Sequence, residues 1–167
     1  RRRVLDSRRN APRQVVRISN FKPAFGLANK HLQTVYSTLF RKLPKINFEI
    51  ETFRFSDGDF TECHWRKTPN HNETTPIVIL FHGLAGSYKS PYIQGAMTEL
   101  SKNGFNAVLM HFRGCSGKEN LLPRSYHSGD GADALEFASN LTKRRPNAKL
   151  FGVGYSLGAN MLLKLLG

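Results

Sequence analysis

The sequence predicts an α/β domain whose mostly parallel sheet is preceded by an antiparallel hairpin. Two continuous apolar runs, Ile77–Phe81 and Ala107–Met110, are typical of strands that are buried on both faces of a parallel sheet. Segments with helical periodicity alternate with these runs, as they do in βαβ units. A G-x-S-x-G segment at residues 154–158 lies between a short apolar run and a helix-forming run, which is the context of a strand-to-helix turn.

The antiparallel hairpin is predicted over residues 48–65. Residues 48–51 alternate apolar and polar side chains, as a half-buried strand does. The alternation slips at Thr52 and Phe53, which allows a bulge there. Residues 56–59, Ser-Asp-Gly-Asp, are a strong turn signal, so we expect the chain to return as a second strand from Phe60.

Helix signals flank the apolar runs. Residues 30–43 form a candidate helix that ends before Pro44. Ser90 and Pro91 have the residue types of an N-cap and a first helical residue, and the helix they begin should end at residues 103–104, Asn-Gly. Its expected apolar stripe comprises Ile93, Met97 and Leu100.

Residues 130–143 are predicted to form the next helix. Asp130 and Asp133 lie near its positive end, where acidic side chains are stabilised. A short strand over residues 150–153 then leads into the G-x-S-x-G turn, and residues 157–166 form the helix that follows. The expected buried stripe of the 130–143 helix comprises Leu135, Ala138 and Leu141.

Length and cysteine usage limit the class of protein. A chain of 167 residues is long enough for one domain with a core. No apolar run approaches the roughly 20 residues that cross a bilayer. Cys63 and Cys115 form no C-x-x-C pair, which argues against a disulfide framework and a zinc site. We therefore expect no metal, and the cysteine usage suits a reducing, cytoplasmic compartment.

Basic residues are concentrated near the start of the chain. Residues 1–45 hold 12 of the 25 Lys and Arg residues and one acidic residue, Asp6. We interpret residues 1–20 as a basic N-terminal arm and residues 21–167 as the folded part. A polybasic arm can contact anionic lipid or nucleic acid, although a solvated terminus is the alternative. Residues 1–17 lack aromatic side chains for base stacking, so peripheral membrane contact is the favoured interaction and nucleic acid is not expected.

Ser156 is the candidate nucleophile. On a sharp strand-to-helix turn, a serine hydroxyl is pushed out of the sheet to where a base and a substrate can reach it. Gly154 and Gly158 suit such a turn, because a β-carbon at either position would strike the opposing chain. The alternative is an ordinary glycine-rich turn of a doubly wound α/β protein.

Acyl transfer also needs hydrogen-bond donors that face the oxygen on which negative charge develops. The amide of Leu157, directly after the serine, is one candidate. The amide of Leu84 is the other, because the loop that begins at His82 and Gly83 leaves the carboxyl end of a predicted parallel strand. An ordinary strand-to-helix turn is the alternative for this loop.

Four further residues invite a catalytic interpretation that we do not favour. Every histidine precedes Ser156, whereas the base follows the nucleophile in this architecture, so His82 is expected to bind backbone groups and shape its loop. His127 is interpreted as a structural histidine at a helix start. Cys115 is interpreted as a packed or exposed thiol, and Arg113 as an anchor of its own loop.

Several motifs, in this order, resemble those of the YheT-type α/β-hydrolase family. They are FKPAFGLANKHLQT at 21–34, FHGL at 81–84, SPY at 90–92, HFRGCSG at 111–117, YHSG at 126–129 and GYSLG at 154–158. The resemblance implies an α/β-hydrolase fold and a serine esterase or lipase without a cofactor. It implies activity on short- to medium-chain acyl esters or acylglycerols, with Ser156 as nucleophile and the amides of Leu84 and Leu157 as oxyanion hole.

The resemblance also implies that the acid and the histidine of the triad lie on loops beyond the serine turn. We therefore expect residues 21–167 to be the N-terminal part of an α/β-hydrolase domain, truncated after the nucleophile helix, and this chain by itself to be inactive. A non-catalytic relative that binds a lipid or protein partner in the same cleft is the alternative. An anion-binding module that depends on residues 1–20 is a third hypothesis.

Overall fold

The computed structural model describes residues 22–23, 29, 46–127 and 129–167. The chain divides into two compact units, Arg1–Phe40 and Arg41–Gly167, and all the helices and strands described below belong to the second. The basic arm over residues 1–20 and the candidate helix over residues 30–43 lie outside the described residues.

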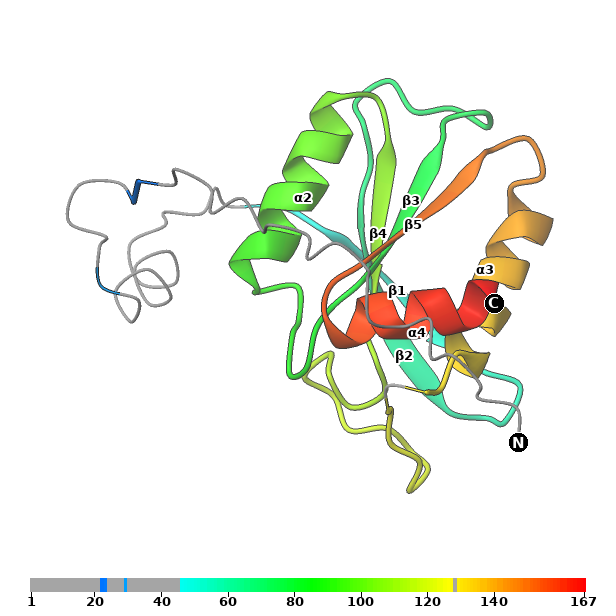
Figure 1. Ribbon diagram of the computed structural model, residues 1–167. Helices are drawn as coiled ribbons and strands as arrows, with labels where there is room; N and C mark the ends of the chain where they lie inside the picture. The colour runs from blue at the N-terminus through cyan, green and yellow to red at the C-terminus, as the bar shows by residue number, and fades with distance from the viewer. Residues whose placement is uncertain (1–21, 24–28, 30–45, 128) are drawn as a thin grey trace, which may run out of the picture. The chain divides into compact units, whose positions relative to one another are not determined.

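The described residues form one five-stranded sheet in the order β1-β2-β4-β3-β5 (Figure 1). The pairs β1–β2 and β2–β4 are antiparallel, and β4–β3 and β3–β5 are parallel. The predicted α/β class, with an antiparallel hairpin leading into parallel strands, is therefore confirmed. The strands are β1 Glu49–Arg54, β2 Phe60–Arg66, β3 Ile77–Phe81, β4 Asn106–Met110 and β5 Leu150–Gly154.

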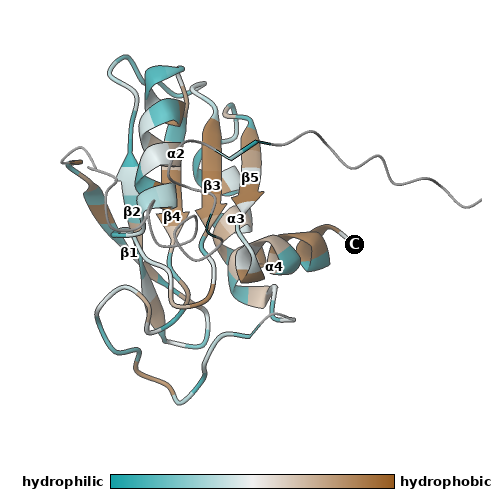
Figure 2. Ribbon diagram, turned by 60° about the vertical axis from the view of Figure 1, so that its left-hand side comes forward, coloured by the Kyte–Doolittle hydropathy of each residue, from teal (hydrophilic) through white to brown (hydrophobic). Residues whose placement is uncertain are grey.

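Helices cover both faces of the sheet, as continuous apolar strands require. Successive side chains of a strand point to opposite faces, so β3 contributes Ile79 to one core and Leu80 to the other. Helix α2 (Pro91–Lys102) packs on the Leu80 face, and α3 (Ala132–Arg144) and α4 (Leu157–Leu166) pack on the Ile79 face. Figure 2 shows the hydrophobic character of β3 and β5 in this layered arrangement.

Helix α2 begins where the sequence predicts. Ser90 is its N-cap residue and Pro91 its first residue, and the helix is capped at Asn103. Proline suits the first position because the amide that it lacks would have no helical partner there. Ile93 and Met97 are fully buried and hold the helix on the sheet, whereas Leu100 is only partly buried.

The buried stripe of α3 differs from the predicted one. Leu135 is 56% exposed, and the buried positions are Ala134, Phe137 and Leu141. Both sets have helical spacing, but the second brings the larger Phe137 ring onto the sheet. There it meets Phe53 of β1 edge to face, with the ring centroids 5.1 Å apart.

The hairpin contains no bulge. The bulge that the sequence allowed, where the apolar and polar alternation slips at Thr52 and Phe53, is therefore wrong. The register of β1 and β2 runs without interruption from Glu49 opposite Trp65 to Arg54 opposite Phe60. The slip arises because Ile50 is on the exposed face of β1, where it is 60% exposed. Glu51 therefore shares a face with Phe53 and accepts a 2.7 Å hydrogen bond from Trp65 Nε1.

The corrected stripe of α3 can be tested by mutation. We expect Phe137→Ala to lower the free energy of unfolding by about 3–5 kcal/mol, because it empties a fully buried site. Leu135→Ala removes an exposed side chain and should change it by less than about 0.5 kcal/mol. Urea denaturation of the full-length variants measures both values. Similar losses from the two substitutions would contradict the observed packing.

Candidate active site

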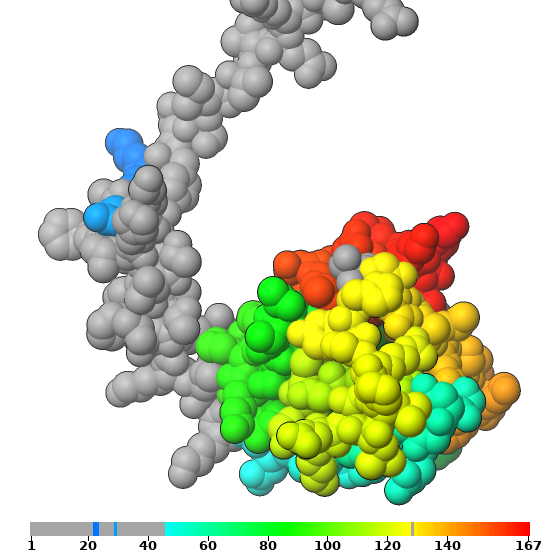
Figure 3. Space-filling model, turned by 90° about the horizontal axis from the view of Figure 1, so that it is seen from below, coloured from blue at the N-terminus to red at the C-terminus, as the bar shows by residue number. Residues whose placement is uncertain are grey.

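Three connections meet at the carboxyl ends of the parallel strands. Residues 82–90 follow β3, residues 111–131 follow β4, and the turn at Tyr155 and Ser156 follows β5. Figure 3 views the molecule from this end, where the green, yellow and red segments of the chain adjoin. Ligand sites of open α/β sheets lie at this edge.

Ser156 occupies a strained turn between β5 and α4. Its φ and ψ angles are 52° and −114°, outside the regions that L-residues ordinarily adopt. The residue is exposed, and its hydroxyl has no hydrogen-bond partner in the part of the chain that the structure describes. Such strain persists only where the surrounding structure imposes it, and it is concentrated at functional sites.

The two glycines of the G-x-S-x-G segment impose the turn. A β-carbon at Gly154 would lie 2.5 Å from the Ala159 Cα, and one at Gly158 would lie 2.5 Å from the Phe81 carbonyl oxygen. These contacts are with backbone atoms, which cannot move aside. The predicted steric requirement for glycine at both positions is therefore confirmed. A β-carbon at Gly83 would lie 3.5 Å from the Ser156 β-carbon, so the loop after β3 adjoins the serine.

The amides of Leu84 and Leu157 have no acceptor among the described residues. In the loop after β3, the seven other amides from Gly83 to Ser90 all donate hydrogen bonds to side chains or carbonyl groups. Leu157 is the first residue of α4, where amides lack a helical partner. These two amides therefore remain unused, one in the loop that adjoins Ser156 and one directly after Ser156 in the chain.

His82 is a structural group, as predicted. It is completely buried, and the Phe112 amide donates to its Nε2 across 3.2 Å. The Nδ1 must then carry the proton, and it donates to the Gly83 carbonyl at 2.7 Å. Burial lowers the pKa of His82, which favours this neutral form.

His111 makes the reciprocal connection, which the sequence did not reveal. Its Nε2 accepts the Tyr88 amide at 3.1 Å, and its Nδ1 donates to the Glu62 carbonyl at 2.8 Å. His111, in the loop after β4, thus binds an amide of the loop after β3. His82, in the loop after β3, binds an amide of the loop after β4. Burial, its largest cause, lowers the pKa of His111 to about 4.

His127 and Cys115, which the sequence also singled out, have structural surroundings. His127 is exposed, and its Nδ1 accepts the Gly129 amide at 3.2 Å just before α3. Cys115 is half-buried beside the core, and burial raises its thiol pKa, which disfavours the reactive thiolate. Neither is arranged as a nucleophile or as a base for Ser156.

Arg113 anchors the loop after β4, as predicted. Its side chain is 2% exposed, and its Nε and Nη2 donate to both carboxylate oxygens of Asp133 at 2.7 and 2.8 Å. Its Nη1 donates to Asp59 at 2.8 Å and pairs with Asp57, also at 2.8 Å. The guanidinium lies 4.2 Å from the Phe55 ring centroid. A buried charge is tolerated only with such complete pairing.

Asp59 is the partner that sequence reasoning missed. The sequence predicts only a turn at residues 56–59. The signal for a cationic partner such as Arg113 is the pair of aspartates in that turn. Burial would raise the pKa of Asp59, but hydrogen bonds from the amides of Leu121 and Phe60 and from Arg113 outweigh it, and the pKa falls well below its usual value. The hairpin and the loop after β4 are joined by this carboxylate.

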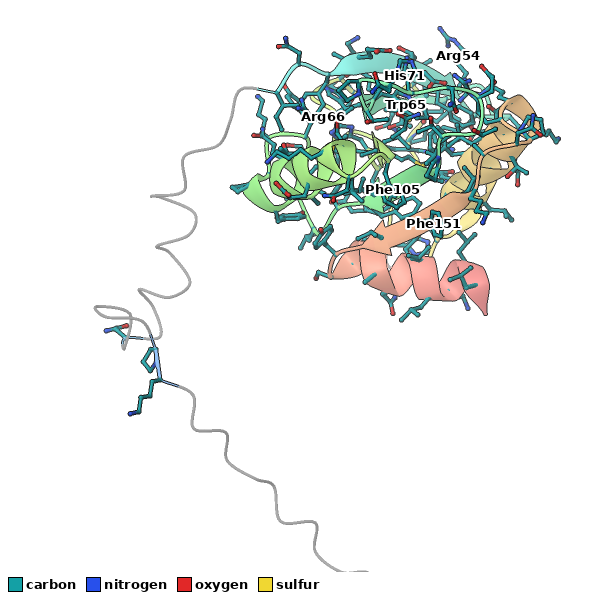
Figure 4. The ribbon with its side chains drawn as sticks, turned by 90° about the horizontal axis from the view of Figure 1, so that it is seen from above. Arg54, Trp65, Arg66, His71, Phe105 and Phe151 are labelled. Atoms are coloured by element: carbon teal, nitrogen blue, oxygen red, sulfur yellow. The ribbon has the colours of Figure 1, made fainter. Side chains whose placement is uncertain are left out.

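A cavity lies at the opposite end of the sheet. It has a volume of about 450 Å³ and is lined by Trp65, Ile77, Asn106 and charged residues of β1 and α3. Ile77 and Asn106 begin their strands, so this cavity is remote from Ser156; Figure 4 views that end, with Trp65 and Phe151 labelled. Among the described residues, no three His, Cys, Asp or Glu side chains are grouped to hold a metal ion. None of their helices is long and apolar enough to span a membrane.

The buried histidines predict a stability that falls with acidification. Burial lowers the pKa values of His64, His82 and His111. Above the ordinary histidine pKa of about 6.5, the rings are neutral in both states. As pH falls from there towards 4, the unfolded chain gains protons that the folded chain resists, at up to about 1.4 kcal/mol per pH unit for each histidine.

Urea denaturation of the full-length protein between pH 7.5 and 4.5 would measure this dependence. His111→Gln should flatten it, since one titrating site is lost. His127→Gln, at an exposed histidine, serves as the control and should leave the pH dependence of the free energy of unfolding unchanged. An equally steep dependence in the His111 variant would contradict the assignment.

Comparison with known proteins agrees with this geometry. The model of the "alpha/beta hydrolase fold" family matches residues 76–167. "Putative esterase YheT" of Escherichia coli is 42% identical over 148 residues, which are 89% of this chain and 44% of that protein. "Monoacylglycerol lipase" of Saccharomyces cerevisiae is 32% identical over 99 residues, which are 59% of this chain and 22% of that protein. The chain thus spans less than half the length of these two relatives.

Solved structures agree on the fold. An α/β serine hydrolase without a lid from Xanthomonas campestris superposes with a TM-score of 0.58 at 20% sequence identity, covering 75% of this chain and 58% of that one. At this sequence identity the match shows the fold alone. The family model and the 42% identity to YheT show that the chain is a YheT-type member of the α/β-hydrolase family.

Proposed function

We propose that the full-length protein is a serine hydrolase of carboxylic esters that forms an acyl-enzyme on Ser156. The observation that carries the proposal is the pair of unused amides, Leu84 and Leu157, beside a strained and exposed serine. The names of the relatives, an esterase and a monoacylglycerol lipase, support ester substrates. We infer short- to medium-chain acyl esters or acylglycerols as the substrate class, with no cofactor.

In the proposed reaction, Ser156 Oγ attacks the ester carbonyl carbon while a base takes its proton. The carbonyl oxygen becomes negative and accepts hydrogen bonds from the two amides, each of which typically contributes on the order of 10²–10³ in rate. The C–O bond to the alcohol then breaks, and the alcohol leaves with that proton. Water hydrolyses the acyl-enzyme by the same steps and releases the acid.

The base for this reaction is not among His82 and His111, since both nitrogens of each ring already have hydrogen-bond partners. Because the base follows the nucleophile in α/β-hydrolases and every histidine here precedes Ser156, we assign the base and its orienting acid to residues outside those that the structure describes. A serine hydroxyl at its ordinary pKa is a poor nucleophile without such a base. The proposal accordingly concerns the full-length protein.

A fluorophosphonate probe tests the nucleophile, because it forms a covalent bond with an activated serine. We expect the full-length protein to be labelled at Ser156, and Ser156→Ala to abolish both labelling and the hydrolysis of p-nitrophenyl butyrate. Ser116→Ala, in the neighbouring loop after β4, is the matched control and should keep both. Equal labelling of the Ser156 variant would place the nucleophile elsewhere. An unlabelled wild type would favour the non-catalytic relative.

We further propose that residues 1–20 form a basic arm that precedes a hydrolase domain over residues 21–167 in the chain, and that the arm contacts anionic membrane surfaces. The support is its composition, seven arginines against one aspartate. A cytoplasmic location is consistent with free thiols at Cys63 and Cys115. Imaging of the tagged full-length protein outside the cytoplasm would contradict that location.

Vesicle sedimentation tests the arm. The full-length protein should bind vesicles that contain 30% phosphatidylserine, with an affinity that falls as salt rises, because screening weakens charge attraction. Deletion of residues 1–20 should abolish this binding and leave ester hydrolysis intact. Phosphatidylcholine vesicles are the control. Binding that survives the deletion would show that the arm is not the contact.

A further inference from the structure

Two tyrosines from different elements reach the loop that carries Leu84. Tyr92 lies in the first turn of α2, and its hydroxyl accepts the Gly83 amide at 3.0 Å. Tyr126 lies between β4 and α3, and its hydroxyl accepts the Ala85 amide at 3.3 Å. Both tyrosines belong to motifs of the sequence, SPY and YHSG, for which the proposed reaction has no role.

The two hydroxyls hold the residues on either side of Leu84. A peptide group is planar, so fixing an amide fixes the orientation of the whole plane that contains it. The Gly83 amide fixes the plane before Gly83, and the Ala85 amide fixes the plane after Leu84. The Leu84 amide belongs to the plane between these two. That plane also contains the Gly83 carbonyl, which accepts from His82 Nδ1 at 2.7 Å and from the Gly86 amide at 3.0 Å, so the two tyrosines add to this restraint by fixing the planes on either side.

Backbone strain in the same loop calls for such support. Ala85 has a φ of 52°, and the other non-glycine residue of the described chain with a positive φ is Ser156. Each of the two is adjacent to one candidate donor, since Ala85 follows Leu84 and Ser156 precedes Leu157. A strained residue in an exposed loop would relax unless neighbouring groups held it, and the Tyr126 hydroxyl holds Ala85.

Both hydroxyls are themselves held in place. A β-carbon at Gly86 would lie 2.6 Å from the Tyr92 hydroxyl, so the glycine leaves room for it. The Tyr92 ring lies 4.7 Å from the ring of Tyr155, the residue before the serine. The Tyr126 ring stacks on Phe112 with centroids 4.8 Å apart.

We propose that Tyr92 and Tyr126 are positioning residues that direct the Leu84 amide towards the developing oxyanion. This inference rests on the proposed function, since it assigns a task within that reaction. Neither tyrosine touches the substrate. Each acts through the backbone, and loss of either hydroxyl leaves the Leu84 amide present but misdirected.

Phenylalanine substitutions in the full-length protein test this role, because they remove only the hydroxyls. We expect Tyr92→Phe and Tyr126→Phe each to lower kcat for p-nitrophenyl butyrate about tenfold to a hundredfold, with KM changed by less than about twofold. Tyr88→Phe is the matched control. Tyr88 lies in the same loop and stacks on His64, and its hydroxyl has no partner among the described residues, so activity should be unchanged.

The double variant and a transition-state analogue separate positioning from mere stability. The fold-decrease in kcat of the double variant should be smaller than the product of the two single decreases, because both hydroxyls act through one amide. Binding of butylboronic acid, whose tetrahedral adduct occupies the oxyanion site, should weaken in each variant by the same factor as kcat/KM falls. A purely structural role would instead lower the melting temperature and leave boronate affinity intact.

The outcomes distinguish this inference from the proposed function. If wild-type protein is labelled at Ser156 and both phenylalanine variants match Tyr88→Phe in kcat and boronate affinity, the positioning role is wrong and the hydrolase proposal stands. A change confined to KM would also overturn the positioning role. If the wild type is neither labelled nor active, both proposals fail together.

Discussion

The backbone contact between the serine turn and the end of β3 is the constraint on which the site depends. Gly158 lies so close to the carbonyl oxygens of Phe81 and His82 that a β-carbon would come within 2.5 and 2.6 Å of them. The Tyr155 amide donates to the same Phe81 carbonyl at 3.0 Å. This approach brings α4 onto β3, forces Ser156 into its positive φ, and places the loop that follows β3 beside the serine.

Polar groups from distant segments stabilise the loops around that contact. His82 and His111 each accept an amide from the other's loop, and Arg113 joins the loop after β4 to the hairpin and to α3 through Asp59 and Asp133. A buried polar group that loses its partner costs about 1–3 kcal/mol, so each connection resists opening. The result is a rigid frame in which the amides of Leu84 and Leu157 are left without acceptors.

The sequence predicted the elements of the fold well, and its errors have a common origin. Periodicity located α3 but selected Leu135 over Phe137, because both lie on stripes with helical spacing. Alternation located β1 but placed Ile50 inside and suggested a bulge. In both cases the sequence defines the period, whereas the face that is buried depends on the partner, here the contact between Phe137 and Phe53.

The sequence by itself determined the strand, turn and helix around Ser156, because the glycines and the flanking apolar runs that predict them are adjacent in the chain. It also determined the structural character of His82 and Arg113. Only the tertiary structure decided the partners of these side chains, the role of His111, and the contacts of Tyr92 and Tyr126 with the Leu84 loop. Those partners are up to 54 residues apart in the chain, as Arg113 and Asp59 are. Hydrogen bonds at that separation form here because the sheet brings strand ends together.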